Sequence, residues 1–475
     1  MSRLPLLKGV LDYINENNIS FSMPGHKNGD GFIRTDEGKK LYDNIIKMDI
    51  TEVEGVDNLH KPEGIIKESL NLLKEYYGSK KAYFLVNGST SGNLAMIFSC
   101  FQEGDKVLVE RNCHRSIMNG IITRKLKPVY INNKIDKKYN APLSIDEEYF
   151  FDTIKENYDA KGIIITYPNY YGICLDLKKI IKEAHKANMY VLVDSAHGAH
   201  FGVCEELPES AVKSGADMVV MSSHKTLPSF TQTAYLHINN SDLIDKSDFY
   251  VSAFTSTSPS YMLMCSMEYT RYYLQYFGRT DYKKLINTAE IYRKKINTIE
   301  GIHILALESL DNSIHDMDKS RYIINIKEGY SAEGVMSYLR KNGIQSEMND
   351  TNNIILILSP FNKESDFKLL YNKLKECNLE NYKEEKIVLL NADSPSIKLW
   401  PYEVIERRKI IIELDKSEGS ISAEAIVPYP PGVPIIMPGE IISKNIIKMI
   451  QYYLKNNKSI LGLIKDKDKY FIKIV

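Results

Sequence analysis

Cysteine is scarce in this sequence of 475 residues, and its six copies lie far apart. None of the intervals between them matches the short spacings of a zinc site, so we expect no metal site. A chain of this length needs no disulfide framework, and the simplest location is therefore the reducing cytoplasm. The six positions are Cys100, Cys113, Cys174, Cys204, Cys265 and Cys377.

An excess of either charge is also absent, because 61 Lys and Arg residues balance 61 Asp and Glu residues. This balance gives no support for a surface that binds nucleic acid or an anionic membrane. The sequence has no run of about 18 apolar residues, and residues 1–20 lack the apolar core of a signal peptide. We therefore expect no nucleic-acid partner and no membrane partner.

Short apolar segments rich in Val, Ile and Tyr follow one another between residues 81 and 238. Strands covered on both faces have this composition. Amphipathic segments at 91–101 and 176–188 lie between them and predict helices. The alternation predicts an α/β domain with a mostly parallel sheet. The seven expected strands are 82–86, 105–110, 127–131, 162–167, 189–194, 217–222 and 234–238.

After about residue 260 the sequence pattern changes, over nearly half of the chain. A long helix is expected over 261–298, followed by strands at 321–326 and 353–359 and helices near 332–342 and 364–376. We expect a major domain in residues 1–300 and a smaller α+β C-terminal domain in residues 301–475. Within the latter, the segment 421–442 is expected to be an ordered loop, since its prolines at 428, 430, 431, 434 and 438 do not suit central strands or helix interiors.

A polar motif, NGSTSGN, occupies residues 87–93, between an expected strand and an expected helix. The start of a helix offers free backbone N–H groups and a favourable dipole for an anion. Gly88 permits a tight turn, and Ser89, Thr90 and Ser91 add hydroxyl donors. The motif therefore predicts a phosphate site, although an ordinary helix cap with spare serines is an equal alternative.

Three further candidates follow expected strands at the edge where α/β proteins bind ligands. Asp194 ends one strand and could hold a pyridine nitrogen protonated, Lys225 in SSHKTLP could form a Schiff base, and His114 in ERNCHRS could stack on a ring. A turn aspartate, a solvated lysine and a loop histidine are the alternatives when each residue is taken alone. Together with the phosphate motif, these three residues are the kinds of group that bind pyridoxal 5′-phosphate: a phosphate site, a ring-stacking side chain, a partner for the pyridine nitrogen and an amine for the Schiff base.

Eight segments of the chain carry a family resemblance. PGHK, the NGST turn and HKTLP occur in that order, and the sequence resembles the short-form Orn/Lys/Arg decarboxylases, which are pyridoxal-phosphate enzymes of fold type I, like aspartate aminotransferase. The segments are FSMPGHKNGDGF (21–32), DITEVEGVDNLHKPEG (49–64), YFLVNGSTSGN (83–93), ERNCHRS (110–116), VDSAHGAHFG (193–202), SSHKTLPSFTQTA (222–234), TSTSPSY (255–261) and VPYPPGVPIIMPGE (427–440).

The resemblance implies roles for residues in these motifs. Lys225 would carry the cofactor, Asp194 would pair with its pyridine nitrogen, and His114 would stack on the ring opposite Ala196. At least a homodimer is implied, with Thr257 and Ser258 reaching the cofactor of the neighbouring subunit. His197 would also contact the cofactor. One departure is Ser195, where many relatives have an acidic residue, and this weakens detailed expectations for His197 two residues later. The phosphate would be surrounded by Ser89, Thr90, Ser91, Ser222 and His224.

The implied reaction is decarboxylation of a basic amino acid. Arginine, which would give agmatine, is the first expectation, ahead of lysine to cadaverine or ornithine to putrescine. Either His114 or Lys225 would return the proton to Cα. A cationic side chain needs carboxylates, for which Glu52, Glu54, Asp57 and Glu440 are candidates, although each could equally be a surface charge or a loop cap. Alternatives to the decarboxylase are an aminotransferase, aldolase or other lyase that uses the same cofactor, and a cofactor-binding regulatory protein without turnover.

Overall fold

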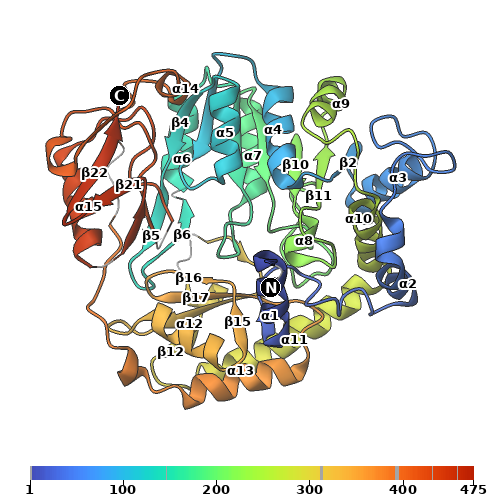
Figure 1. The fold of residues 1–475 in the computed structure, drawn as a ribbon. Coiled ribbons are helices and arrows are strands. Elements are labelled where there is room, and N and C mark those ends of the chain that lie inside the picture. The colour runs from blue at the N-terminus through green and yellow to red at the C-terminus, as the bar shows by residue number, and fades with distance from the viewer. Residues whose placement is uncertain (1–2, 146, 311–313, 391–394, 430–431, 457) are drawn as a thin grey trace.

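The computed structural model describes residues 3–145, 147–310, 314–390, 395–429, 432–456 and 458–475. Figure 1 shows a large α/β layer at the top, a smaller sheet with helices below it, and a C-terminal unit at one side. In the described residues, no helix is both long enough and apolar enough to cross a membrane.

The central sheet has seven strands in the order β2-β11-β10-β9-β7-β3-β4. Every neighbouring pair is parallel except the two pairs that involve β11, which runs antiparallel to β10 and β2. The expected mostly parallel sheet is confirmed. Its strands are β2 (Lys81–Leu85), β3 (Lys106–Glu110), β4 (Lys127–Ile131), β7 (Gly162–Thr166), β9 (Tyr190–Asp194), β10 (Met218–Met221) and β11 (Ala234–Ile238).

Both faces of this sheet are covered, which explains why its strands are apolar throughout. Because successive side chains point to opposite faces, Val191 and Val193 pack in one core cluster and Leu192 in another. The Leu192 face packs against α4 (Gly88–Cys100) and α5 (Arg115–Thr123), and the other against α6 (Glu147–Glu156) and α7 (Leu177–Lys186). Asp176 caps α7 by accepting from the backbone N–H of Lys179.

The smaller sheet follows α10 (Tyr261–Tyr273) and α11 (Arg279–Ile296). One long helix was expected over this region; instead, wider helical turns at Leu274–Gly278 separate two α-helices. Gly278 lies so close to Val203 that a Cβ would come within 2.8 Å of it. The sheet contains β12 (Ile302–Ile304), β14 (Arg321–Ile326), β17 (Asn353–Ile357) and β16 (Met348–Asn349), with α12 (Ala332–Lys341) and α13 (Glu364–Glu376) packed on it.

Segments far apart in the sequence complete the smaller region. The N-terminal β1 (Ile19–Phe21), which the sequence did not predict, pairs in parallel with β15 (Ile344–Ser346).

The other elements of the chain include two strand pairs and four helices. The strand pairs are the hairpin β5 (Asn133–Asp136) and β6 (Ala141–Ile145), and β8 (Ile173–Cys174) with β13 (Asp316–Met317). The helices are α2 (Asp36–Asn44), α3 (Ile65–Tyr77), α9 (Ile244–Ala253) and α14 (Pro401–Ile405).

The C-terminal unit has a core of its own, built from α15 (Lys444–Lys455) and the three-stranded sheet β18 (Ile410–Glu413), β22 (Lys469–Ile474) and β21 (Leu463–Asp466). The proline-rich segment 421–442 was expected to be a loop, yet it contains the short strand β19 (Val427–Tyr429), paired with β20 (Ser459–Leu461). A two-stranded ribbon tolerates Pro428 because both of its strands are edges. Pro430 and Pro431 lie outside the described residues.

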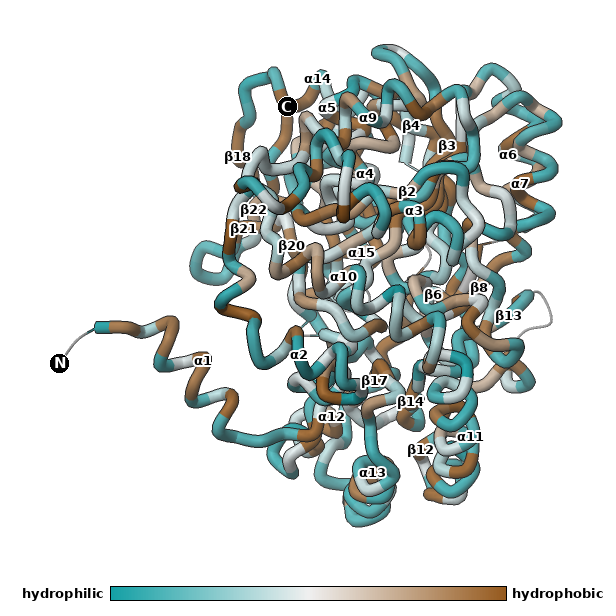
Figure 2. The backbone as a smooth tube through the Cα atoms, turned by 90° about the vertical axis from the view of Figure 1, so that its right-hand side faces the viewer, coloured by the Kyte–Doolittle hydropathy of each residue, from teal (hydrophilic) through white to brown (hydrophobic). Residues whose placement is uncertain are grey.

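The first helix, α1 (Pro5–Asn15), projects away from the rest of the chain (Figure 2). None of its residues is buried, although the helix is amphipathic. Its apolar side chains are exposed, Leu6 to 80% and Leu7 to 53%. An ion pair between Glu16 and Arg340 attaches the end of this segment to α12.

Candidate active site

Three expected site residues lie at or just after the carboxyl ends of parallel strands, of which β9 and β10 are neighbours and β3 is separated from β9 by β7. Asp194 is the last residue of β9, Lys225 lies in the short α8 (Ser223–Thr226) after β10, and His114 caps the start of α5 after β3. The charges of Asp194 and Lys225 both act on the pKa of His114, so the structure brings the three groups together. Strand ends in a parallel sheet form the usual ligand-binding edge of such folds.

One amide, that of Asn93 in α4, joins Asp194 to the loop that carries His114. Its Nδ2 donates to Asp194 Oδ2 at 2.9 Å and to Ser116 Oγ at 2.8 Å. Ser116 Oγ in turn lies 2.7 Å from His114 Nδ1, which also accepts from the Ser116 amide at 3.2 Å. Because Nδ1 accepts, the neutral ring carries its proton on Nε2. Burial lowers the pKa of His114, which favours this neutral ring.

Lys225 has an unusual neighbour for a lysine. Its Nζ lies 3.0 Å from Nε2 of His197, and Nδ1 of the same ring lies 3.3 Å from Nη2 of Arg321. Burial lowers the pKa of Lys225; Asp194 opposes this shift, and Arg321 adds to it. A lysine amine that is neutral part of the time is the form that can attack a carbonyl carbon.

The start of α4 is arranged for an anion. No side chain caps this helix, so the backbone N–H groups of its first turn remain available. Gly88 adopts φ = +73°, a conformation that favours glycine. The hydroxyls of Ser89 and Ser222 lie 2.5 Å apart and join this turn to the loop after β10. The other two hydroxyl residues of the motif are placed differently from Ser89. Thr90 is exposed, and Ser91 donates its hydroxyl to the Gly88 carbonyl.

His224 was expected to donate to a phosphate. Its Nδ1 lies 2.9 Å from the carbonyl oxygen of Thr233, which can only accept, so Nδ1 carries a proton. Only Nε2 is left for an anion, and it donates only when the ring is protonated. Burial lowers the pKa of His224, so the neutral ring is favoured until an anion is close by.

Pyridoxal 5′-phosphate fits this set of groups. The oxygens of Asp194 receive N–H bonds from Asn93 and Ala196, and a carboxylate oxygen retains a further lone pair for a pyridine N–H. Lys225 supplies the amine, and the α4 start with its serine hydroxyls suits the phosphate. Ala196 is buried, directly after the strand end that carries Asp194. The roles of these individual residues stay predictions.

The PGHK motif is a structural part of this edge. The Gly25 amide donates to the His224 carbonyl at 2.8 Å, and a Cβ on Gly25 would come within 2.5 Å of the Leu227 backbone. The neighbouring Lys27 is buried and donates to the Ile357 carbonyl at 3.0 Å. The motif therefore joins the cofactor loop to the smaller sheet, which sequence reasoning did not show.

Two carboxylates that were candidates for the substrate end are engaged elsewhere. Asp57 accepts from five backbone N–H groups around the start of α3, as a loop cap does. Glu440 is 1% exposed and binds the Arg111 guanidinium through both oxygens, at 2.7 and 2.6 Å. Glu52 and Glu54 lie in the loop before α3. The carboxylates whose charges act on Lys225 are Asp194 and Glu347.

The TSTSPSY segment lies on an exposed surface. Thr257 and Ser258 are both exposed, and the segment contacts the 49–64 loop where the Ser256 carbonyl lies 2.8 Å from Nε2 of His60. Ser256 also donates its amide to Asn87 at 3.3 Å, next to the start of α4. This surface therefore continues from the phosphate turn outwards.

Several site residues were not singled out from the sequence. Asn93 and Glu110 stand inside motifs that were recognised, NGSTSGN and ERNCHRS. Glu110 ends β3, and the charge of Asp194 acts on its pKa; Asn93 lies in the second turn of α4. Their positions at a strand end and near the start of a helix were a usable signal. Arg321 and Glu347 come from the smaller sheet region, more than 90 residues further along the chain. Nothing in their local sequence marks them, because only the folding of one domain against the other brings them to Lys225.

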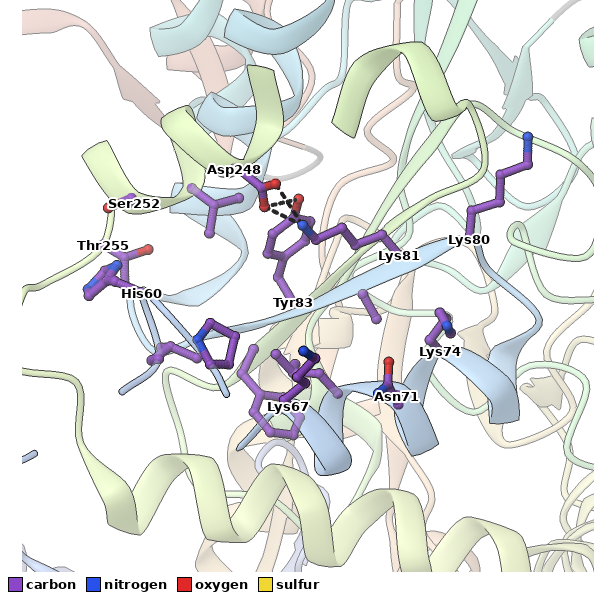
Figure 3. A pocket seen from close by; sticks show the side chains of 16 residues that line it. His60, Lys67, Asn71, Lys74, Lys80, Lys81, Tyr83, Asp248, Ser252 and Thr255 are labelled. Atoms are coloured by element: carbon purple, nitrogen blue, oxygen red, sulfur yellow. Dashed lines mark hydrogen bonds and ion pairs between the residues drawn. The ribbon is translucent and has the colours of Figure 1, made fainter. Parts of the chain in front are cut away.

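A cavity of about 580 Å³ lies beside β2, and Lys225, Asp194 and His114 are not among the residues that line it. Figure 3 shows Lys67 and Lys74 on α3, Lys81 on β2 and Asp248 on α9 around it. Lys81 Nζ donates to both oxygens of Asp248, at 2.5 and 2.7 Å. The walls of this cavity thus carry several lysines and one histidine, His60, whose Nε2 lies 2.8 Å from the Ser256 carbonyl oxygen.

Comparison with known proteins identifies the family of the chain. Residues 4–322 match the Orn/Lys/Arg decarboxylase major domain, and residues 400–463 match the Orn/Lys/Arg decarboxylase C-terminal domain. The chain belongs to the Orn/Lys/Arg decarboxylase family. It is 35% identical over 473 residues to the uncharacterized protein YaaO of Bacillus subtilis, covering 98% of each chain. It is 32% identical over 460 residues to an arginine decarboxylase of the same organism, covering 95% of this chain and 93% of that protein.

Among solved structures, the lysine decarboxylase of Francisella novicida superposes with a TM-score of 0.79 at 20% identity, covering 99% of this chain and 81% of that one. This confirms the expected fold, the type I architecture of pyridoxal-phosphate enzymes with a C-terminal region. The expected family and enzyme class, a decarboxylase, are confirmed as well.

Proposed function

We propose that this chain decarboxylates L-arginine to agmatine and CO₂ with pyridoxal 5′-phosphate as its cofactor. The observation that carries the proposal is the contact between the Lys225 amine and His197 at the strand edge that also holds Asp194. Arginine is favoured over lysine because relatives described as arginine decarboxylases are 31–33% identical, whereas an inducible lysine decarboxylase of Escherichia coli is 22% identical.

In the proposed mechanism, pyridoxal phosphate supplies a ring that can accept the electrons released when the bond between Cα and the carboxylate breaks. Asp194, oriented by Asn93, would accept the N–H of that ring and hold the proton there. The helix start at Gly88, with Ser89 and Ser222, would bind the phosphate group. His114 is fixed by Ser116 with its Nε2–H unbound within the described residues, so this atom is one source of the proton for Cα. The Lys225 amine is the other.

We also propose that two copies of the chain form the active enzyme. The amphipathic α1 projects with its apolar side chains exposed, as expected for a helix that packs on a second copy. The 49–64 loop, with Glu52 and the exposed Val53, lies on the same surface as Thr257 and Ser258. Light scattering of the wild-type chain should give twice the mass of one chain, and deletion of residues 1–15 should lower it. A monomeric, fully active wild type would contradict this proposal.

A cytoplasmic location is part of the proposal. All six cysteines are free thiols in the structure, and free thiols persist in a reducing compartment. Cell fractionation followed by immunoblotting checks it, and recovery in an oxidising compartment would contradict it.

The deciding experiment is incubation of the purified, cofactor-loaded protein with arginine, lysine or ornithine in separate reactions. Mass spectrometry of the amine and trapping of CO₂ identify substrate and reaction together. We expect agmatine as the main product. Cadaverine or putrescine would change the substrate but keep the reaction. A keto acid without CO₂ would replace the decarboxylase with an aminotransferase, and an intact cofactor with no product from any amino acid would favour a regulatory protein.

A further inference from the structure

Arg321 is the one arginine that contacts His197 among the described residues, and its guanidinium can only donate hydrogen bonds. It is 2% exposed and stands at the start of β14. Its Nη1 donates to the Tyr170 carbonyl, its Nη2 points at His197 Nδ1, and its Nε lies 3.9 Å from Asp318 Oδ2. A guanidinium has five N–H donors and no acceptor, so His197 Nδ1 must present a lone pair to it.

This contact determines the rest of the ring. A neutral imidazole with a lone pair on Nδ1 carries its proton on Nε2. That nitrogen is 3.0 Å from Lys225 Nζ. An ammonium group has donors only and would meet another N–H there, whereas a neutral amine has a lone pair to accept it. Both contacts of His197 are therefore satisfied together only when the Lys225 amine is neutral.

We infer that Arg321 is a positioning residue that selects the His197 tautomer able to hold Lys225 as a neutral amine. The inference rests on the proposed function only in that Lys225 must react with a pyridoxal-phosphate aldehyde. It adds a role for two residues, Arg321 and His197, that the reaction itself does not touch.

Neighbouring groups hold the His197 ring and the Arg321 guanidinium in place. Tyr170 contacts the His197 ring edge-on, with 4.8 Å between the ring centroids, and donates its hydroxyl to Glu347 at 2.6 Å. Asp318 is fully buried beside Arg321 and accepts from Ser320 Oγ at 2.6 Å. His197 cannot turn over without breaking these packed contacts.

Three charged groups and burial act on the protonation of Lys225. Asp194 at the end of β9 and Glu347 between β15 and β16 favour the ammonium form, while Arg321 and burial oppose it. Burial lowers the pKa of His197, His114 and His224, which favours the neutral form of each ring. The carboxylates of Asp194 and Glu347 favour the ammonium form of Lys225. The His197 N–H instead favours the neutral amine, which can accept its hydrogen bond.

The test measures covalent uptake of pyridoxal 5′-phosphate by the full-length protein freed of cofactor, followed by absorbance from pH 6 to 10. In this reaction the Lys225 nitrogen forms a C=N bond with the aldehyde carbon, and the aldehyde oxygen leaves as water. Only the neutral amine reacts, so the midpoint pH of the rate reports its protonation. Arg321→Met removes both the charge and the donor, and should move the midpoint upward by about one pH unit.

Arg321→Gln removes the positive charge but keeps a hydrogen-bond donor, because the glutamine amide can still donate to His197 Nδ1. The tautomer inference predicts a clearly smaller shift for Arg321→Gln than for Arg321→Met, and a loss of most of the Arg321→Met shift in a His197→Phe background. Equal shifts for the two variants, or an undiminished shift without His197, would show that only the charge acts and would overturn the inference.

Arg271→Met is the matched control. Arg271 is 7% exposed, on α10, and binds Gln275 rather than any group of the site. It should keep the wild-type midpoint, and a shift as large as that of Arg321→Met would overturn the inference. Wild-type uptake with no decarboxylation would contradict the proposed function alone, whereas a wild-type chain that takes up no cofactor would contradict both.

Discussion

Lysines occur in two regions of this molecule, several around one cavity and a single one at the strand edge, and the two regions differ in what the amines contact. Around the cavity of Figure 3, Lys81 donates to the carboxylate of Asp248, and its side chain is 35% exposed. At the strand edge, the single Lys225 contacts an imidazole nitrogen that an arginine holds from behind. A carboxylate partner stabilises the ammonium, whereas an N–H partner requires the amine. The partner of a lysine, more than the number of lysines, therefore indicates which one is reactive.

The comparison is tested most strongly by removing each amine. Lys225→Ala should abolish both product formation and covalent cofactor uptake, because no other described lysine amine lies against an imidazole. Lys81→Ala should retain both, since its amine is paired with Asp248. Amine product by mass and absorbance of the bound cofactor measure the two effects. Full activity of Lys225→Ala would remove the basis of the assignment.

The two carboxylates can be compared in the same way. Asp194→Ala should retain some cofactor but slow turnover by roughly 10²–10³-fold, the usual cost of losing one preorganised electrostatic partner. Asp248→Ala, at the surface cavity, should leave the rate unchanged. Steady-state rates with saturating cofactor measure both variants. A near wild-type rate for Asp194→Ala would refute its role at the pyridine nitrogen.

Some residues of this site could be predicted from the sequence, and others could not. Asp194, Lys225 and His114 were predictable because strand ends in a parallel sheet share one edge, and the apolar strands were visible. Arg321 and Glu347 were not, because their approach depends on how the β14 sheet docks against the larger one.

The fold shows the same division. The seven strands of the central sheet were predictable from apolar segments buried on both faces. The pairing of β1 with β15 was not, since it joins residues 19 and 344, which no local pattern relates. The substrate carboxylates illustrate a third case: Asp57 and Glu440 have the right chemistry, but neighbouring backbone N–H groups and Arg111 already occupy them.

Burial at the site edge also predicts a pH effect on stability. Burial raises the pKa of Glu110 to about 7 from an ordinary value of 4.5, and the nearby Asp194 adds to it. The folded state then binds a proton that the unfolded state has released, so this stabilisation is present below about pH 4.5 and is lost as the pH rises through 7. The wild type should lose about 2 kcal/mol of unfolding free energy between pH 5 and 7 relative to Glu110→Gln.

Urea denaturation of both chains at several pH values measures this difference. Glu110→Gln keeps an oxygen for the Thr166 amide, which donates to Glu110 at 3.1 Å, so the fold should persist. Asp248→Asn serves as the control at an exposed carboxylate. Parallel pH profiles for the wild type and Glu110→Gln would show that Glu110 does not titrate in this range.

The smallest effect is expected at the surface cavity itself. The Lys81–Asp248 pair is partly exposed on both sides, with 35% and 48% of the side chains accessible, so its coupling should be below about 1 kcal/mol. A double-mutant cycle with Lys81→Ala and Asp248→Ala, followed by urea denaturation, measures it. Raising the salt concentration should reduce the coupling further because exposed charges are screened. A coupling of several kcal/mol that is insensitive to salt would place this pair among buried networks, and the contrast between the two lysine regions would then fail.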